Sequence, residues 1–190
     1  WFSEALIEVF GTTGAIDRYD FAGKTDPQIV LDLMTGAGLG RAEVLERLPT
    51  IREAFGGRMV PNLSAEGMAL LPGVVELLER EVARPDRAIG LLTGNWERTG
   101  RAKLDRLGLD SYFAFGGFGD DGIERHELVP AALARAERHA GRRFQPEEVL
   151  VIGDTVHDVG CAKVHGLPVL AVATGRKDAM TLAAAGADRV

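Results

Sequence analysis

The sequence predicts an α/β fold that combines a parallel sheet with a small unit made only of helices. Two observations lead to this prediction. Residues 72–190 alternate short apolar runs with amphipathic segments, which is the order that produces parallel strands with crossover helices. Residues 1–71 show helical periodicity and no convincing strand. We therefore expect a helical cap at 1–71 and an α/β core at 72–190, with the boundary at Pro72-Gly73.

Composition excludes several classes of protein. The chain has 190 residues, of which 46% are hydrophobic, so a substantial core is expected. A net charge of −6 argues against a nucleic-acid-binding surface, which requires a basic excess. Cys161 is the single cysteine, so no internal disulfide is possible, and we expect a reducing, cytoplasmic setting. No apolar run approaches the roughly 20 residues that span a bilayer.

The expected cap contains four helices. The first covers residues 1–10. The second begins at Asp26-Pro27, because a capping side chain followed by proline is a strong helix start. The third covers residues 41–55 and is expected to stop at Gly56-Gly57. A shorter helix is expected at residues 64–71.

The expected core alternates helices and strands along the chain. Its strands are predicted at residues 88–92, 112–115, 149–152 and 168–173, and Asp188–Val190 resembles the beginning of another. Its helices are predicted at residues 74–82, 96–107, 128–140, 155–166 and 177–185.

The most informative stretch is V-L-V-I-G-D-T-V-H-D-V at residues 149–159. Four apolar residues suit a buried parallel strand, and Gly153 then allows a sharp turn. Asp154 falls just past the strand, and Asp158 lies four residues on, in the first turn of the next helix. Both carboxylates can therefore face the crevice where open α/β sheets bind ligands, and together they suit Mg²⁺. The alternative is that Asp154 and Thr155 only cap the helix.

A second candidate site element is L-L-T-G-N at residues 91–95, again where a strand ends and a helix begins. Thr93 can offer a hydroxyl, and the amides of Gly94 and Asn95 point out of the turn, which is a typical anion site. The alternative is that Thr93 or Asn95 simply caps the helix. Paired with the crevice beside Asp154, the turn is better interpreted as part of a binding site.

Taken together, these motifs resemble the haloacid dehalogenase superfamily, in particular its phosphoglycolate-phosphatase-like branch. The matches are L-L-T-G-N, K-L-D-R-L-G-L at residues 103–109, G-D-T-V-H-D-V at 153–159, and G-K-T-D-P at 23–27 in the cap. The resemblance implies a Rossmann-like core with a helical cap, and hydrolysis of a phosphate monoester through a phospho-aspartate. It also implies that Thr93 holds the phosphate, while Asp154 and Asp158 hold or orient Mg²⁺.

The first motif of that family, D-x-D-x-T after a central strand, is absent from the sequence. Residues 17–20 read D-R-Y-D but follow no apolar strand, so they are not a substitute. The nucleophile is therefore not among the 190 residues, and we expect the natural protein to extend upstream and the C-terminus to be clipped. The sheet would then lack the strand that lies, in the family, between those at residues 88–92 and 149–152. Without the nucleophile, the 190 residues alone should be inactive.

The lysine of the family, before the helix that leads to the G-D strand, is also absent. Arg125 is the nearest positional match and keeps the charge, although it could equally be a solvated surface residue. Lys24 and Thr25 could reach substrate from the cap, or could belong to an ordinary loop before a helix. Lys103 is interpreted as a surface residue.

These observations predict a Mg²⁺-dependent phosphatase that acts on a small phosphorylated metabolite, with phosphoglycolate suggested by resemblance alone. No nucleic-acid or membrane partner is expected, and the sequence indicates no oligomeric state. Two alternatives stay open. One is a 2-haloacid dehalogenase on the same scaffold, which needs no metal. The other is a non-catalytic binding module that has lost the nucleophile.

Overall fold

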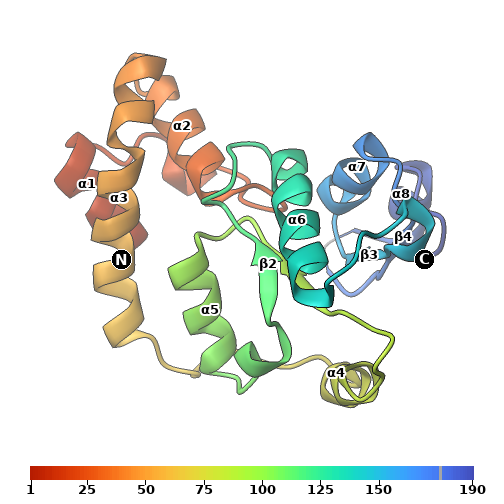
Figure 1. The fold of residues 1–190 in the computed structure, drawn as a ribbon. Coiled ribbons are helices and arrows are strands. Elements are labelled where there is room, and N and C mark those ends of the chain that lie inside the picture. The colour runs from red at the N-terminus through yellow and green to blue at the C-terminus, as the bar shows by residue number, and fades with distance from the viewer. Residues whose placement is uncertain (176) are drawn as a thin grey trace.

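A computed structural model of the protein describes residues 1–175 and 177–190. Figure 1 shows the cap helices on one side, α7 and α8 with strands β3 and β4 on the other, and α6 with β2 between them. Parallel strands with covering helices and a helical cap confirm the predicted α/β class. No helix in the described part of the chain is long and apolar enough to cross a membrane.

The cap is built from α1 (Phe2–Phe10), α2 (Asp26–Gly36) and α3 (Arg41–Asn62), with a short 3₁₀ turn, η1 (Ile16–Arg18), before α2. These helices bury a common apolar cluster that includes Phe55, and the ring of Phe2 packs edge to face against that of Phe55, with 5.1 Å between their centroids. Trp96 belongs to the same cluster although it lies in the core sequence. The apolar centre of the cap therefore extends across the predicted boundary.

Two predictions for the cap were wrong. Helix α3 does not stop at Gly56-Gly57 but continues to Asn62, and residues 64–71 form a turn and irregular chain instead of a helix. The helix continues because Phe55 and Met59 on either side of the glycines are buried in the cap cluster. A Cβ at Gly56 would approach Arg98 to 3.3 Å, so this glycine permits close packing rather than ending the helix.

The core follows the predicted order, with shifted boundaries. In chain order its elements are α4 (Val74–Val82), β1 (Gly90–Leu92), α5 (Glu97–Asp105), η2 (Asp110–Tyr112), β2 (Phe115–Gly117), η3 (Arg125–Glu127), α6 (Leu128–Ala140), η4 (Pro146–Glu148), β3 (Val151–Gly153), α7 (Val156–Val164), β4 (Val169–Ala171) and α8 (Ala179–Ala184).

The strand predicted at residues 112–115 in fact begins at Phe115, and a 3₁₀ turn precedes it. Arg101 explains the shift. Its guanidinium donates to the Asp110 carboxylate at 3.0 Å and to the Phe113 carbonyl at 3.2 Å. These contacts hold the segment as a turn against α5, so the strand starts only after it.

The strands form two separate parallel pairs. β1 pairs with β2, with Leu91 opposite Gly116, and β3 pairs with β4, with Ile152 opposite Leu170. Within the described residues β1 and β3 share no ladder. Ile152 is 53% exposed, although a strand of this composition is normally covered on both faces. The expected strand at the C-terminus is present only as a single bridge between Leu170 and Arg189.

Candidate active site

The turn Thr93–Asn95 follows β1 directly and is held on two sides. The N–H of Thr93 donates to the Gly117 carbonyl at 3.0 Å, and its Oγ1 accepts from the N–H of Asn95 at 3.3 Å. A Cβ at Gly94 would clash with the backbone carbonyl oxygen of Lys24, so only glycine lets the cap lie this close. The turn is thus seated between β2 and the cap segment that contains Lys24.

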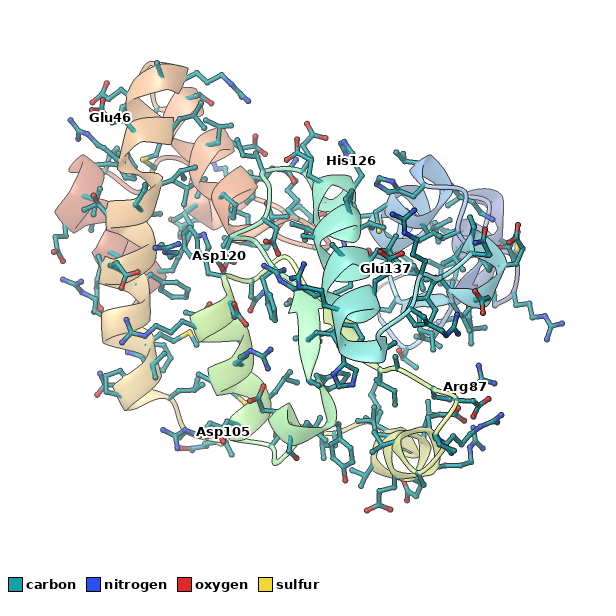
Figure 2. All side chains as sticks on the ribbon, viewed as in Figure 1. Glu46, Arg87, Asp105, Asp120, His126 and Glu137 are labelled. Atoms are coloured by element: carbon teal, nitrogen blue, oxygen red, sulfur yellow. The ribbon has the colours of Figure 1, made fainter. Side chains whose placement is uncertain are left out.

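Helix α5 opens behind this turn, and its first amides are capped by carboxylates from elsewhere in the chain. Its own N-cap residue, Trp96, makes no side-chain cap. Instead the N–H of Trp96 donates to Asp26 at 2.9 Å, and the N–H of Glu97 donates to Asp120 at 2.6 Å. Figure 2 places Asp120 where the cap meets the core.

This capping reduces the number of groups that the predicted anion site can offer to a ligand. Neither Thr93 nor Asn95 caps α5, because Asp26 and Asp120 occupy that position. The positive end of the helix dipole is therefore already matched by negative charge. Among the described residues, the groups of the turn that remain suited to an anion are the Gly94 N–H and the Thr93 hydroxyl.

The segment after β3 is built around a reciprocal capping box. Thr155 Oγ1 accepts from the N–H of Asp158 at 3.2 Å, and Asp158 Oδ2 accepts from the N–H of Thr155 at 2.9 Å and from its hydroxyl at 2.7 Å. Gly153 is required here, since a Cβ would clash with the Asp158 side chain. The capping interpretation therefore holds for Thr155, with Asp158 as its partner.

Asp154 has a different environment from Asp158. Asp154 lies outside the capping box, and its carboxylate faces Gly175, where a Cβ would clash with it. Asp158 is 3% exposed and also forms a salt bridge to Arg125, with 2.5 Å between Oδ1 and Nη2. The two aspartates predicted as metal ligands are thus not equivalent.

Arg125 lies between the two motif segments and is not a solvated surface residue, because its side chain is only 15% exposed. Besides Asp158, it donates to the Leu92 carbonyl and to the Gly23 carbonyl, each at 3.4 Å. Its Nε is buried with no hydrogen-bond partner in the part of the chain that the structure describes. One guanidinium therefore touches the strand before the turn, the segment after β3, and the cap.

The side chains of Lys24 and Thr25 are directed into protein contacts. The ammonium of Lys24 is 2.7 Å from the Tyr19 hydroxyl and 3.0 Å from Asp32 Oδ2. Burial and the neighbouring Asp32 carboxylate raise the pKa of Tyr19 well above its usual value. Thr25 is fully buried, donates to the Ile123 carbonyl, and caps α2 by accepting from the N–H of Gln28 at 3.1 Å.

Comparison with known proteins assigns the family. The model of haloacid dehalogenase-like hydrolases matches residues 2–163. The chain belongs to this family. It is 31% identical to a phosphoglycolate phosphatase from Synechococcus elongatus over 64% of this chain and 54% of that protein. It is also 31% identical to phosphoglycolate phosphatase 1 from Pseudomonas aeruginosa, over 73% of this chain and 47% of that protein.

The fold comparison agrees with this assignment. The crystal structure of a hydrolase from Pseudomonas syringae superposes with a TM-score of 0.65 at 21% identity, covering all of this chain and 83% of that one. The chain spans about half the length of the curated relatives that it matches. The family and its phosphoglycolate-phosphatase-like branch, expected from the sequence, are therefore confirmed.

Sequence reasoning missed three residues at the site of this family member. Lys103, interpreted above as a surface residue, donates through its ammonium to Asn95 Oδ1. Trp96 is 3% exposed and lies in the cap cluster. Asp26 was expected to cap α2, but Thr25 is the N-cap, which leaves the Asp26 carboxylate to reach Trp96. No sequence pattern signals a contact between residues 26 and 96, because it depends on tertiary packing.

Asp26 is also electrostatically unusual. Burial raises the pKa of its carboxyl to about 6, against the lowering effects of the Trp96 N–H and the charge on Lys103. The neighbouring Asp120 raises the pKa further. The carboxyl consequently titrates close to neutral pH rather than in the usual acidic range.

The residues present suit Mg²⁺ binding. Within residues 1–175 and 177–190 there is no group of three or more His, Cys, Asp or Glu side chains that could hold a metal. Magnesium does not require one, because it usually takes one or two carboxylates and fills its octahedron with water and substrate phosphate. Asp154, at the end of β3 and outside the salt bridge, offers such a carboxylate, and Asp158 is placed to orient the segment.

Proposed function

We propose that the protein containing this chain is a Mg²⁺-dependent phosphatase for a small phosphorylated metabolite of the phosphoglycolate type. One observation supports this most directly: Arg125 links the segment before the Thr93 turn to the Asp158 segment, at the carboxyl ends of parallel strands and beside the cap. Ligands of open α/β sheets bind at this edge. The curated relatives are phosphoglycolate phosphatases, which agrees with the proposal.

In this proposal the turn after β1 holds the phosphate. The Thr93 hydroxyl and the Gly94 N–H would donate to its oxygens, and Asn95 would be oriented by Lys103. Arg125 would add positive charge to the site, in the role that a lysine has in the family. Phosphoryl transfer depends mainly on positioning and charge neutralisation, so these groups would supply much of the catalysis.

Asp154 would hold Mg²⁺, which would neutralise phosphate charge when bound. Asp158 would fix the geometry of this segment through Thr155 and Arg125. The nucleophile is proposed to be an aspartate outside the 190 residues, on the motif that the sequence lacks, and to form a phospho-aspartate. The 190 residues alone are then expected not to turn over phosphate esters.

The cap would exclude water and select the substrate. Lys24 and Thr25 are the proposed substrate contacts. To reach the substrate, Lys24 would have to leave Tyr19 and Asp32, and Thr25 would have to leave the Ile123 carbonyl and become exposed. We further propose that the protein is cytoplasmic and acts without nucleic-acid or membrane partners, in keeping with its net charge of −6.

The test is phosphate release by the full-length natural protein from a panel of phosphomonoesters that includes 2-phosphoglycolate. Activity should require Mg²⁺ and be lost in EDTA. Asp154→Asn should lower kcat/KM by about 100-fold or more, the scale for losing one electrostatic contact to a transition state. Asp105→Asn, an exposed aspartate at the end of α5, is the matched control and should match the wild type.

Two other results would replace the proposal. Halide release from a 2-haloacid in EDTA, with no phosphate release, would indicate a dehalogenase. Binding of inorganic phosphate without turnover of any ester would indicate a non-catalytic module. Unchanged turnover by Asp154→Asn at every Mg²⁺ concentration would remove the metal assignment alone.

A further inference from the structure

We propose that Asp26 is a positioning residue, which acts from the cap to hold the Thr93–Asn95 turn in its binding geometry. The proposal rests on the proposed function, because it assigns the turn to phosphate. It adds a residue from the cap that does not itself touch substrate. The inference follows from how α5 is capped and from where the cap segment lies.

The first observation is that Asp26 contacts Gly94, in the middle of the turn, and Trp96, the residue that follows it. Its backbone N–H donates to the Gly94 carbonyl at 2.7 Å, and its carboxylate accepts from the N–H of Trp96 at 2.9 Å. These two bonds flank the peptide groups of residues 94–96. Any movement of this part of the cap therefore strains the turn directly.

The second observation is that α5 has no local alternative to this cap. Trp96 is its N-cap residue and contributes no side-chain hydrogen bond. The first turn of a helix has amide N–H groups without partners inside the helix. In α5, two of these groups donate to carboxylates from outside the helix. Asp120 serves the N–H of Glu97 and is itself paired with Arg52 of the cap at 2.9 Å.

The third observation is that the side chain of Trp96, which follows the turn, packs among the side chains of the cap. Trp96 is buried in the cap cluster, with its ring 6.1 Å from that of Phe55. The position of the start of α5, and with it the turn, is thus defined by the cap as well as by β2.

The contact that the Asp26 carboxylate makes beside the turn is a hydrogen bond that it accepts from the N–H of Trp96. Lys103 and Asp120 are the charged groups that act on it, with opposite effects on its pKa. A negative charge near a phosphate site would oppose the binding of an anion. An amide oxygen in the same place would keep the acceptor without that repulsion, so Asn should substitute for Asp.

The experiment compares Asp26→Ala with Asp26→Asn in the full-length protein. The first readout is the inhibition constant of inorganic phosphate, which reports the turn directly. Asp26→Ala should raise it about ten-fold, the scale for losing a charge-assisted hydrogen bond, whereas Asp26→Asn should change it less than about three-fold. Asp17→Ala, an exposed aspartate of the cap, is the matched control and should have no effect.

The second readout is hydrogen exchange of the Trp96 amide, which requires no activity. Asp26→Ala should speed this exchange about ten-fold or more, and Asp26→Asn should preserve the protection. If the wild type hydrolyses no ester, the proposed function fails but this measurement still tests the coupling between Asp26 and the turn. Should the Ala variant not fold, Asp26→Leu replaces it with the same expected results, because leucine keeps the bulk of the side chain and offers no acceptor.

Equal phosphate inhibition constants for the wild type and Asp26→Ala would overturn the positioning role. A loss in Asp26→Asn as large as that in Asp26→Ala would also overturn it, since the negative charge would then be the essential property. Unchanged exchange of the Trp96 amide in Asp26→Ala would show that the carboxylate does not cap α5.

Discussion

The two motif segments of the site are held in opposite ways. The turn after β1 is fastened from outside, by Asp26 of the cap and by the burial of Trp96 among cap side chains. The segment after β3 is fastened from within, by the capping box between Thr155 and Asp158. Arg125 is the side chain that contacts both segments.

This difference means that one of the two motif segments of the core is tied directly to the cap. The proposed phosphate turn is bonded to the cap as well as to β2, whereas the proposed metal segment is bonded within its own strand-to-helix connection. A relative displacement of cap and core would therefore change the distance between phosphate and metal groups. A substitution in the cap should therefore affect the turn after β1 more than the segment after β3.

The largest effect is expected from Trp96→Ala, which removes the link between the turn and the cap. Truncating a buried Trp lowers the free energy of unfolding by about 3–5 kcal/mol through lost burial and the cavity left behind. Urea unfolding of the full-length protein measures this change. Phe21→Ala is the control, because Phe21 is a cap residue that is 43% exposed, and it should cost less than about 1 kcal/mol. Equal costs would show that Trp96 does not join cap and core.

A somewhat smaller effect is expected from Arg125→Ala, which breaks the link between the two segments. The change leaves the carboxylate of Asp158 buried without its partner, and should lower the free energy of unfolding by about 3 kcal/mol. Arg125→Lys should recover part of the loss, because a lysine keeps the charge but not the forked geometry. Arg138→Ala, an exposed arginine on α6, should be nearly neutral. If Arg125→Ala is also neutral, the two segments are not coupled through this residue.

The smallest effect is expected from Asp26→Asn and concerns pH. The pKa of Asp26 is raised to about 6 in the folded state from 3.8, so the folded state favours the protonated carboxyl. This stabilisation is complete only below the unfolded pKa of 3.8 and is lost as pH rises through 6, by about 2 kcal/mol between pH 4 and pH 7. The free energy of unfolding of the wild type minus that of Asp26→Asn should therefore fall as pH rises over this range. A difference that stays flat from pH 4 to 7 would contradict the raised pKa.

Sequence reasoning was most successful where structure is decided locally. Helices α4 and α6 begin and end at the predicted residues, because their apolar periodicity and flanking breakers are contained in the segments themselves. The placement of Asp154 beyond β3 follows from the same kind of local signal. The T-x-x-D spacing of Thr155 and Asp158 also carried a capping-box signal, which would have revealed that Asp158 is partly committed to the helix.

Sequence reasoning failed where distant segments decide the outcome. Gly56 resembles a helix stop, but it lies inside α3, where its lack of a side chain lets Arg98 pack closely against the helix. Asp26 resembles the N-cap of α2, but the N-cap is Thr25, one residue earlier. The carboxylate of Asp26 therefore bonds to the start of another helix, α5. Lys103 resembles a surface lysine because nothing in its neighbourhood along the chain indicates Asn95 as a partner.

The capping of α5 by Asp26 has a consequence for the order of folding. Chains are synthesised from the N-terminus, and early segments can fold before later ones emerge. The cap helices α1 to α3 precede α5, so Phe55 and Asp26 can already be in place when Trp96 leaves the ribosome. The cap would then act as a template on which the turn of the active site is assembled, and its first contribution to the enzyme would come during biosynthesis, before any substrate is bound.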